Sequence, residues 1–395
     1  MSRRTILTGG DVVLYEGVMH NGTVVLDGGV IEIVCLGPEY EPSPGDTTIN
    51  CAGRFVCPGF IDLHNQGGNG YSVLDGTEES VEGLCRAHAA HGTTGLLLTP
   101  PIQRESYATL LPMFAGFVGR DTGGAAVLGI HAEGPFLNPG KRGCMPESGV
   151  SEPDFGYFES ILEAGGGAIR EMTIAPELPG SPDIIHRCAT AGVVPSLGHS
   201  NATLTDVLRA VDHGARHVTH FFNAMSPLHH REPGLTGAAL FSPELTVELV
   251  ADGFHVHPWV MGLTIQNKRI DRTCLVTDAM SVMGLPEGEH ESLGLSVTLK
   301  NDRLSLTDDP GVLAGSVLSM DHAVANMVTM VGLSISEAVT MASATPAAVI
   351  GLDGRKGMLA EGFDADIAVL DQRYGTVKTI VGGRVVFDAD GKPRS

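Results

Sequence analysis

Residues that can hold a metal ion or move a proton follow short apolar runs along the middle of the chain. They are His64-Asn65-Gln66, His131-Ala132-Glu133, His199, His220, the pair Asp252 and His255, and Asp278. A single histidine after a strand is more often a structural residue than a ligand. Six such placements in one chain are hard to attribute to chance, so we predict that these side chains share one site.

Glu133, His199 and His220 form the set that best fits a catalytic metal centre. Two imidazoles and one carboxylate leave a fourth position open on Zn²⁺, which suits the activation of water rather than the support of a fold. The sequence therefore predicts one divalent metal ion per chain, with Zn²⁺ favoured.

Asp278 and His255 are residue types that fit acid–base chemistry beside such an ion. The Asp278 carboxylate can take a proton from water and later give it to a leaving amine, as general base and then general acid. The same aspartate could instead cap a helix. His255 can polarise a substrate carbonyl, or it can serve only as a donor to Asp252. We favour the catalytic role for both residues.

The elements that must position these residues are eight short apolar segments that alternate with helical stretches. This alternation predicts an α/β fold, a (β/α)₈ barrel of the TIM type, whose active site forms at the C-terminal ends of the strands. The strands are expected at Phe60–Leu63, Gly95–Leu98, Val127–Ile130, Met172–Ile174, Val193–Leu197, His217–Thr219, Thr246–Val250 and Cys274–Thr277. One helix is expected where Leu204, Val207, Leu208 and Val211 repeat at helical spacing before Gly214.

The fourth expected strand ends in Ala175-Pro176-Glu177 and carries no lysine. A centre of two metal ions bridged by a carbamylated lysine would need a lysine at such a strand end, so this variant is disfavoured.

Both ends of the chain have a different hydrophobicity pattern. Residues 23–33 and 365–387 alternate in hydrophobicity around Gly-Gly turns, which is typical of β-hairpins. We therefore predict a small β-sandwich domain built from both chain termini, residues 1–57 and 359–395, and a metal-dependent barrel domain at residues 58–358.

Composition narrows the range of partners and locations. The net charge of −21 argues against nucleic acid or an anionic membrane surface as a partner, because either would be repelled. The seven cysteines contain no CxxC pair and fit reduced thiols. No apolar run approaches the ~20 residues of a membrane span, and none follows Arg3 and Arg4 as a signal peptide would require. We expect a cytoplasmic protein.

The chain also carries an ordered series of short motifs. They are Pro58-Gly59-Phe60-Ile61-Asp62, Glu133-Gly134-Pro135-Phe136-Leu137-Asn138-Pro139, Gly198-His199-Ser200-Asn201-Ala202-Thr203, Thr219-His220-Phe221-Phe222-Asn223-Ala224-Met225, Arg231-Glu232-Pro233-Gly234, Asp252-Gly253-Phe254-His255-Val256, Thr277-Asp278-Ala279-Met280 and Leu313-Ala314-Gly315-Ser316. The series covers nearly the whole chain and resembles the N-acetylglucosamine-6-phosphate deacetylase family of the amidohydrolase superfamily. Any one motif would be weak, but the ordered set is strong.

The resemblance implies roles for the residues already singled out. Glu133, His199 and His220 would bind the metal, Asp278 would be the acid/base, and His255 would contact the acetamide carbonyl.

The resemblance also implies a homodimer. The backbone around Asn223 and Ala224 would hold the sugar phosphate together with an Arg231 side chain that reaches in from the neighbouring subunit. A guanidinium and amide donors would give a phosphate a focused partner inside an acidic protein. Without this role, Arg231 would form a surface ion pair with Glu232.

Two departures from the family pattern concern the metal count and the sugar. Superfamily members carry His-x-His or Gln-x-Asn after the first strand, whereas this chain has His64-Asn65-Gln66. An amide is a poorer ligand than imidazole, so we expect one tight metal and, at most, a weak second site at His64 and Gln66.

The second departure lies in the loop after the third strand. Many relatives place a substrate-contacting histidine where Met145, or else Cys144, falls here, so we assign Met145 to the substrate site. Cys144 would either modulate the site through oxidation or metal binding, or be an inert loop residue.

These observations predict an enzyme that hydrolyses a linear amide C–N bond. Its substrate would be an N-acetylhexosamine 6-phosphate, with N-acetylglucosamine 6-phosphate favoured, and its products the amino-sugar 6-phosphate and acetate. One alternative is an amidohydrolase for another amide, such as the galactosamine epimer, an N-acyl amino acid or a cyclic amide. The other is an inactive barrel that acts as an assembly module, which should have lost ligands that this chain retains.

Overall fold

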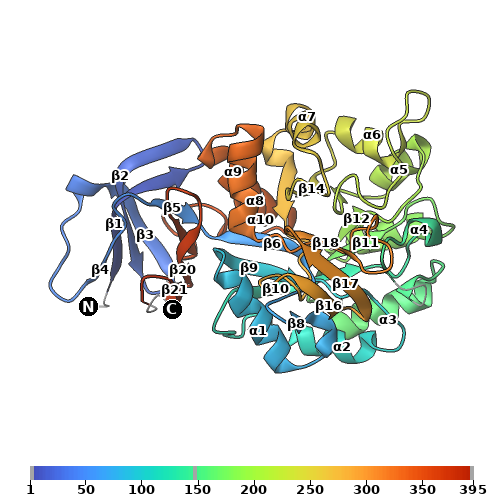
Figure 1. The fold of residues 1–395 in the computed structure, drawn as a ribbon, viewed down its shortest axis with the longest axis horizontal. Helices are drawn as coiled ribbons and strands as arrows, with labels where there is room; N and C mark the ends of the chain where they lie inside the picture. The colour runs from blue at the N-terminus through green and yellow to red at the C-terminus, as the bar shows by residue number, and fades with distance from the viewer. Residues whose placement is uncertain (1–3, 146–148, 392–395) are drawn as a thin grey trace.

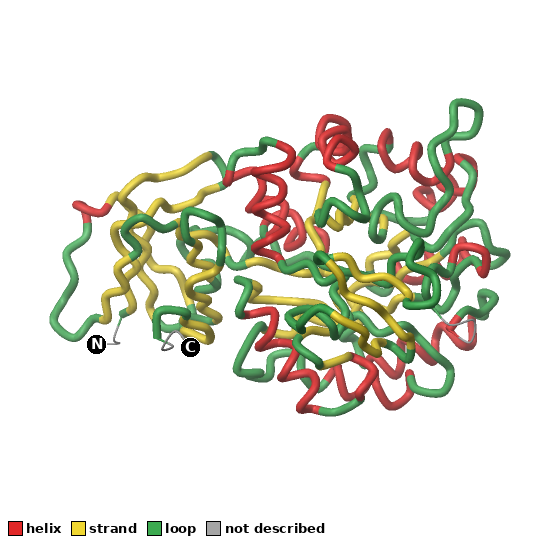
Figure 2. Tube along the Cα trace, in the orientation of Figure 1, coloured by secondary structure: helices red, strands yellow, loops and turns green. Residues whose placement is uncertain are grey.

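A barrel and a smaller all-β unit lie side by side in the computed structural model, which describes residues 4–145 and 149–391 (Figure 1). The blue strands from the start of the chain and the red strands from its end lie together in the smaller unit, where both chain ends are also found. Helices surround the strands of the larger unit, as the colouring by secondary structure makes plain (Figure 2).

Eight parallel strands form the barrel. They are β6 (Phe60–Asn65), β9 (Thr93–Leu98), β10 (Ala126–Glu133), β11 (Ile169–Ile174), β12 (Val194–Leu197), β13 (His217–Val218), β14 (Val247–Val250) and β15 (Thr273–Val276). The first six pair in chain order, and β14 pairs with β15. The backbone N–H of Phe221 donates to the backbone carbonyl of Glu248, and the backbone N–H of Asp278 donates to the backbone carbonyl of His64, each over 2.8 Å. These bonds join β14 to the chain just after β13 and β6 to the chain just after β15, so the two sheets close into a barrel. The predicted fold class is confirmed, and each predicted strand overlaps one of these eight.

Helices follow the barrel strands. They are α1 (Glu78–Ala89), α2 (Tyr107–Ala115), α3 (Phe155–Gly165), α4 (Ser181–Thr190), α5 (Leu204–Asp212), α6 (Gly234–Phe241), α7 (Pro258–Lys268), α8 (Met320–Asn326), α9 (Ile335–Ala342) and α10 (Ala344–Val349). The helix predicted from its apolar spacing is α5. Thr203 and Asp206 begin it with a reciprocal capping box, and Gly214 follows it with a positive φ of 109°. None of the helices in the described ranges combines the length and apolarity that a membrane span requires.

The smaller unit joins strands from both chain ends. They are β1 (Thr5–Leu14), β2 (Gly17–Asp27), β3 (Val30–Leu36), β4 (Thr47–Asn50), β5 (Phe55–Pro58), β19 (Ile367–Leu370), β20 (Thr376–Val381) and β21 (Arg384–Asp388). The first half of β1 pairs with β4, and its second half pairs with β5. Apolar side chains from β1, β2, β3, β5, β19 and β20 form the buried core of this unit. This layout is consistent with the predicted small sandwich. The exact domain boundaries stay a prediction.

An antiparallel meander interrupts the barrel pattern after β15. It consists of β16 (Gly288–Ser292), β17 (Leu295–Lys300) and β18 (Arg303–Leu306), and it lies across the barrel in Figure 1. Val297, Leu299 and Leu304 bury their side chains against Met280 and Val282, which follow the last barrel strand. The sequence analysis did not predict this element, although it forms part of the wall of the pocket described next.

Candidate metal centre and substrate pocket

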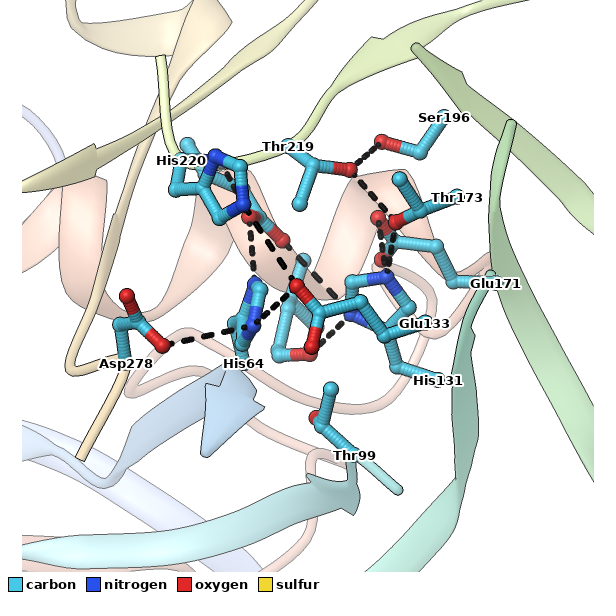
Figure 3. A network of polar contacts seen from close by, with 12 residues as sticks. His64, Thr99, His131, Glu133, Glu171, Thr173, Ser196, Thr219, His220 and Asp278 are labelled. Carbon is cyan, nitrogen blue, oxygen red and sulfur yellow. Dashed lines mark hydrogen bonds and ion pairs between the residues drawn. The ribbon is translucent and has the colours of Figure 1, made fainter. Parts of the chain in front are cut away.

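The three predicted metal ligands converge at the C-terminal ends of their strands. Glu133 is the last residue of β10, while His199 and His220 stand just beyond β12 and β13. The Glu133 Oε1 atom lies 3.2 Å from His199 Nε2 and 3.5 Å from His220 Nε2, and the two nitrogens are 2.9 Å apart. All three residues are buried. Figure 3 shows Glu133 and His220 directed toward each other across the barrel mouth.

The protonation of this group fits a metal ion. His199 Nδ1 donates to the Lys141 carbonyl over 2.8 Å, so Nε2 is the ring nitrogen that faces Glu133 and is free to bind an ion. Burial alone would raise the pKa of Glu133, but His64, His199 and His220 outweigh it and hold that pKa well below its usual range. An ionised carboxylate and imidazole lone pairs that face one point are the donors a divalent cation needs.

Several site residues have a left-handed backbone. The φ angles of His199, His220, Ala224 and Asp278 are 47°, 27°, 50° and 49°. For residues other than glycine this conformation costs about 1–2 kcal/mol each. The His220 N–H donates to a carboxylate oxygen of Glu248 over 2.8 Å, which helps to hold one of these turns. The fold therefore maintains strain at the strand ends, where it turns side chains into the barrel mouth.

Asp278 lines the same cavity from the end of β15. Its Oδ1 atom lies 3.6 Å from His64 Nε2. Burial raises the pKa of Asp278, and the nearby His64 and His220 only partly oppose that rise. No helix begins here, because the chain continues into the meander and the next described helix starts at Met320. The alternative role as a helix cap is therefore wrong.

His255 is held by its neighbour in the segment between β14 and α7. Its Nδ1 donates to Asp252 Oδ2 over 2.6 Å, and its backbone N–H donates to Oδ1 over 2.8 Å. Burial would lower the pKa of His255, but the hydrogen bond to Asp252 outweighs it and the pKa is raised. Since Nδ1 is engaged, Nε2 is the ring nitrogen left to act on a ligand in the cavity.

His64 and Gln66 lie beside the metal centre. The Gln66 side-chain nitrogen donates to Glu133 Oε2 over 2.6 Å, so it orients the carboxylate. His64 Nδ1 contacts Glu248 Oε2 at 3.0 Å, and its Nε2 is 3.5 Å from Glu133 Oε1. The weak second metal site at these two residues stays a prediction. Glu248, which the sequence analysis missed, had one available signal, since it is a carboxylate within an apolar strand.

A cavity of about 270 Å³ joins these groups. Its lining includes the predicted residues Gln66, Glu133, Met145, His199, His220, Asn223, Ala224, His255 and Asp278. Leu293 and Leu295 from the meander and Leu313 beyond it add an apolar wall that the sequence analysis did not anticipate. Cys144 also lines the cavity, and burial raises the pKa of its thiol to about 12, which disfavours the reactive thiolate.

Arg231 lies apart from this cavity in a single chain. It is exposed, and its Nη1 atom is 2.8 Å from His230 Nε2. Glu232 accepts from the backbone N–H groups of Leu204 and Gly234 at 2.9 and 3.1 Å instead of pairing with Arg231. The simple surface ion pair considered for this arginine is therefore not formed.

Comparison with known proteins agrees with this geometry. The amidohydrolase family model matches residues 55–386, and the chain belongs to that family. Membership implies metal-dependent hydrolysis of an amide bond.

More particular similarity is to sugar-phosphate deacetylases. The chain is 32% identical to N-acetylglucosamine-6-phosphate deacetylase of Bacillus subtilis over 380 residues, 95% of each chain. It is 34% identical to N-acetylgalactosamine-6-phosphate deacetylase of Escherichia coli O157:H7, over 90% of this chain and 92% of that one. An aspartate-to-alanine mutant of the Mycobacterium smegmatis N-acetyl-D-glucosamine-6-phosphate deacetylase, in complex with N-acetyl-D-glucosamine-6-phosphate, superposes with a TM-score of 0.90 at 30% identity, covering 98% of this chain and 100% of that one.

Proposed function

We propose that this chain removes the acetyl group from an N-acetylhexosamine 6-phosphate, with N-acetylglucosamine 6-phosphate as the favoured substrate. The observation that carries the proposal is the convergence of Glu133, His199 and His220 on one point, with Asp278 and His255 on the same cavity. The names of the relatives supply the substrate class. The retained set of ligands and acid–base residues argues against an inactive barrel.

Glu133, His199 and His220 would hold a divalent ion, and the oxygen and nitrogen donor set favours Zn²⁺. When bound, this ion acts as a Lewis acid and lowers the pKa of water toward ~7.

Asp278 and His255 divide the proton chemistry. The Asp278 carboxylate accepts a proton from the attacking water, and the resulting carboxylic acid later donates it to the nitrogen of the departing amine. Its burial and raised pKa suit a group that must hold this proton between the two steps. Protonated His255 donates from Nε2 to the carbonyl oxygen of the acetamide, where negative charge develops. The leucine wall excludes water and accommodates the acetyl methyl group.

We further propose that a homodimer completes the phosphate site, with Arg231 reaching the neighbouring cavity. An exposed apolar surface near this arginine supports that assembly. Leu208 and Leu228 are each 52% exposed and Phe241 is 81% exposed, and all three border one surface depression together with His229 and His230. Exposed apolar groups gathered in this way mark contact surfaces.

Two finer features of the proposal rest on separate observations. All seven cysteines are free, which favours a reducing compartment and hence the cytoplasm. N-acetylgalactosamine 6-phosphate is the second candidate substrate, because one relative carries that name and Met145 borders the cavity where many family members have a histidine.

The decisive experiment is an acetate-release assay of the purified protein over phosphorylated and unphosphorylated N-acetylhexosamines. We expect turnover of a 6-phosphate and little turnover of the free sugar. Asp278→Asn should reduce kcat by at least ~10³-fold while the metal content stays near that of the wild type. The exposed Asp353→Asn serves as the matched control and should stay fully active. Full activity in Asp278→Asn, or indifference to the phosphate, would contradict the proposal.

A further inference from the structure

The barrel interior holds a second convergent group of ionisable side chains, which the proposed reaction does not use. Glu171 on β11, His217 on β13 and Glu248 on β14 are all fully buried below the metal centre, nearer the start of their strands. His217 Nε2 lies 3.8 Å from Glu171 Oε1 and 3.7 Å from Glu248 Oε1. The three ligand atoms lie within 4.8 Å of one another.

The hydrogen bonds around His217 fix where its proton lies. The Thr246 hydroxyl donates to the Arg216 carbonyl over 3.0 Å, so it accepts from His217 Nδ1 over 2.5 Å. Nδ1 therefore carries a proton, and Nε2 is the ring nitrogen that faces the two carboxylates. That nitrogen, Glu248 Oε1 and both oxygens of Glu171 have no hydrogen-bond partner among the described residues. Leaving such groups buried and unpaired is costly, which indicates a missing positive partner.

The neighbouring His131 is satisfied in a different way. Its Nδ1 donates to the Leu63 carbonyl over 3.1 Å, and its Nε2 accepts from the Thr173 hydroxyl over 2.7 Å. Thr219 and Ser196 continue this chain of hydroxyl contacts at 2.8 and 2.6 Å (Figure 3). Both ring nitrogens of His131 thus have partners, whereas Glu171, His217 and Glu248 each keep at least one buried atom without a partner among the described residues.

We propose that Glu171, His217 and Glu248 bind a second divalent transition-metal ion inside the barrel, separate from the catalytic ion. The gaps of 3.7 and 3.8 Å are too long for hydrogen bonds. Ligand atoms at ~2.1 Å from a shared ion at a near-tetrahedral angle are separated by about 3.4 Å, so these gaps would have to close by only a few tenths of an ångström around an ion. Two positive charges would neutralise the two carboxylates.

This interior ion would support the catalytic centre through Glu248. The Oε1 atom of that carboxylate faces the interior group, while Oε2 lies 3.0 Å from His64 Nδ1 and accepts from the His220 backbone N–H over 2.8 Å. An ion that fixes Glu248 would therefore also fix the left-handed turn at His220. Glu248 would act as a positioning residue and not as a catalytic one.

The test is elemental analysis of the purified protein, with anomalous diffraction from its crystals on both sides of the absorption edge of the metal that is found. We expect two ions per chain and an anomalous peak between Glu171, His217 and Glu248. Because the interior ion has no exposed ligand, a chelator should remove it much more slowly than the catalytic ion.

Variants assign the two ions independently. Glu171→Gln and His217→Gln should each lose the interior ion, and His199→Gln should lose only the catalytic ion. His88→Gln alters another fully buried histidine whose Nε2 donates to Gly67, and this control should retain both ions. A wild-type protein with one ion per chain after growth in zinc-supplemented medium, or a water molecule without anomalous signal at the interior position, would overturn the proposal. Two ions retained in Glu171→Gln would overturn it as well. The wild-type diffraction decides the matter even where a variant does not fold.

Discussion

Replacing Asp252 by asparagine isolates the electrostatic control of His255. The side chain keeps its shape and still accepts a hydrogen bond, so the change removes a charge beside a buried imidazole. The contact is short, 2.6 Å, and both side chains are less than one-tenth exposed. A charge-assisted hydrogen bond of this kind is worth about 1.5–3 kcal/mol. We therefore expect kcat/KM to fall by roughly 10–100-fold.

The pH profile distinguishes this effect from general damage. Asp252 raises the pKa of His255, so the protonated ring that donates to the carbonyl persists until the pH rises through that raised value. In Asp252→Asn the pKa of His255 drops, because only the charge of Asp278 then opposes the effect of burial. The alkaline limb of kcat/KM should move to lower pH.

The assay is initial-rate acetate release over about pH 5.5–9.5 with saturating metal, and metal content is measured for each protein. Asp353→Asn is the control for loss of one exposed carboxylate and should reproduce the wild-type profile. An alkaline limb that stays in place, with kcat/KM within about twofold of wild type, would refute the assignment of His255 as the protonated donor.

Three further outcomes follow from single contacts. Gln66→Leu removes the donor to Glu133 and should weaken metal affinity by about 10-fold or more, measured by competition with a chelator. Lys356→Met removes the cation that pairs with Asp364 and Asp366, and it should lower the free energy of unfolding by about 2 kcal/mol in denaturant titrations. Lys356 and Arg355 lower the pKa of Asp364 in the wild type. The contribution of the Asp364 carboxylate to stability should therefore decline as the pH falls through the carboxyl range. Cys144 should resist iodoacetamide at pH 8 in the folded protein, because its thiol is half-buried and its pKa is raised to about 12. Rapid alkylation with loss of activity would contradict the protonated state of this thiol.

Much of the fold could be predicted because its signals are local. Strand segments such as that ending at Leu98 are apolar and short, and α5 shows its spacing and cap within a dozen residues. The convergence of Glu133, His199 and His220 could also be predicted, since the C-terminal ends of parallel barrel strands must meet at one mouth. The three histidine and glutamate contacts follow from this topology once the strands are assigned.

Other features depended on contacts that have no local signature. The meander of β16 to β18 is short and polar on one side, and its role emerges only because Leu293 and Leu295 come to lie against a cavity built from other strands. Glu248 reads as an isolated carboxylate in an apolar strand, yet it joins His64 to the backbone of His220 across the barrel. The reading of Asp278 as a helix cap was locally reasonable and failed because no helix follows it.

The amino-acid sequence alone determined which residue types stand at the ends of the strands, because the apolar pattern of a strand and the ligand residue that follows it lie within one short segment. Only the tertiary structure decided which atoms of those residues face one another. Proton positions, such as that on His255 Nδ1 beside Asp252, depend on partners and burial that distant segments supply. The same physical reason explains the interior group of Glu171, His217 and Glu248, because its unpaired atoms exist only once three separate strands enclose them away from water.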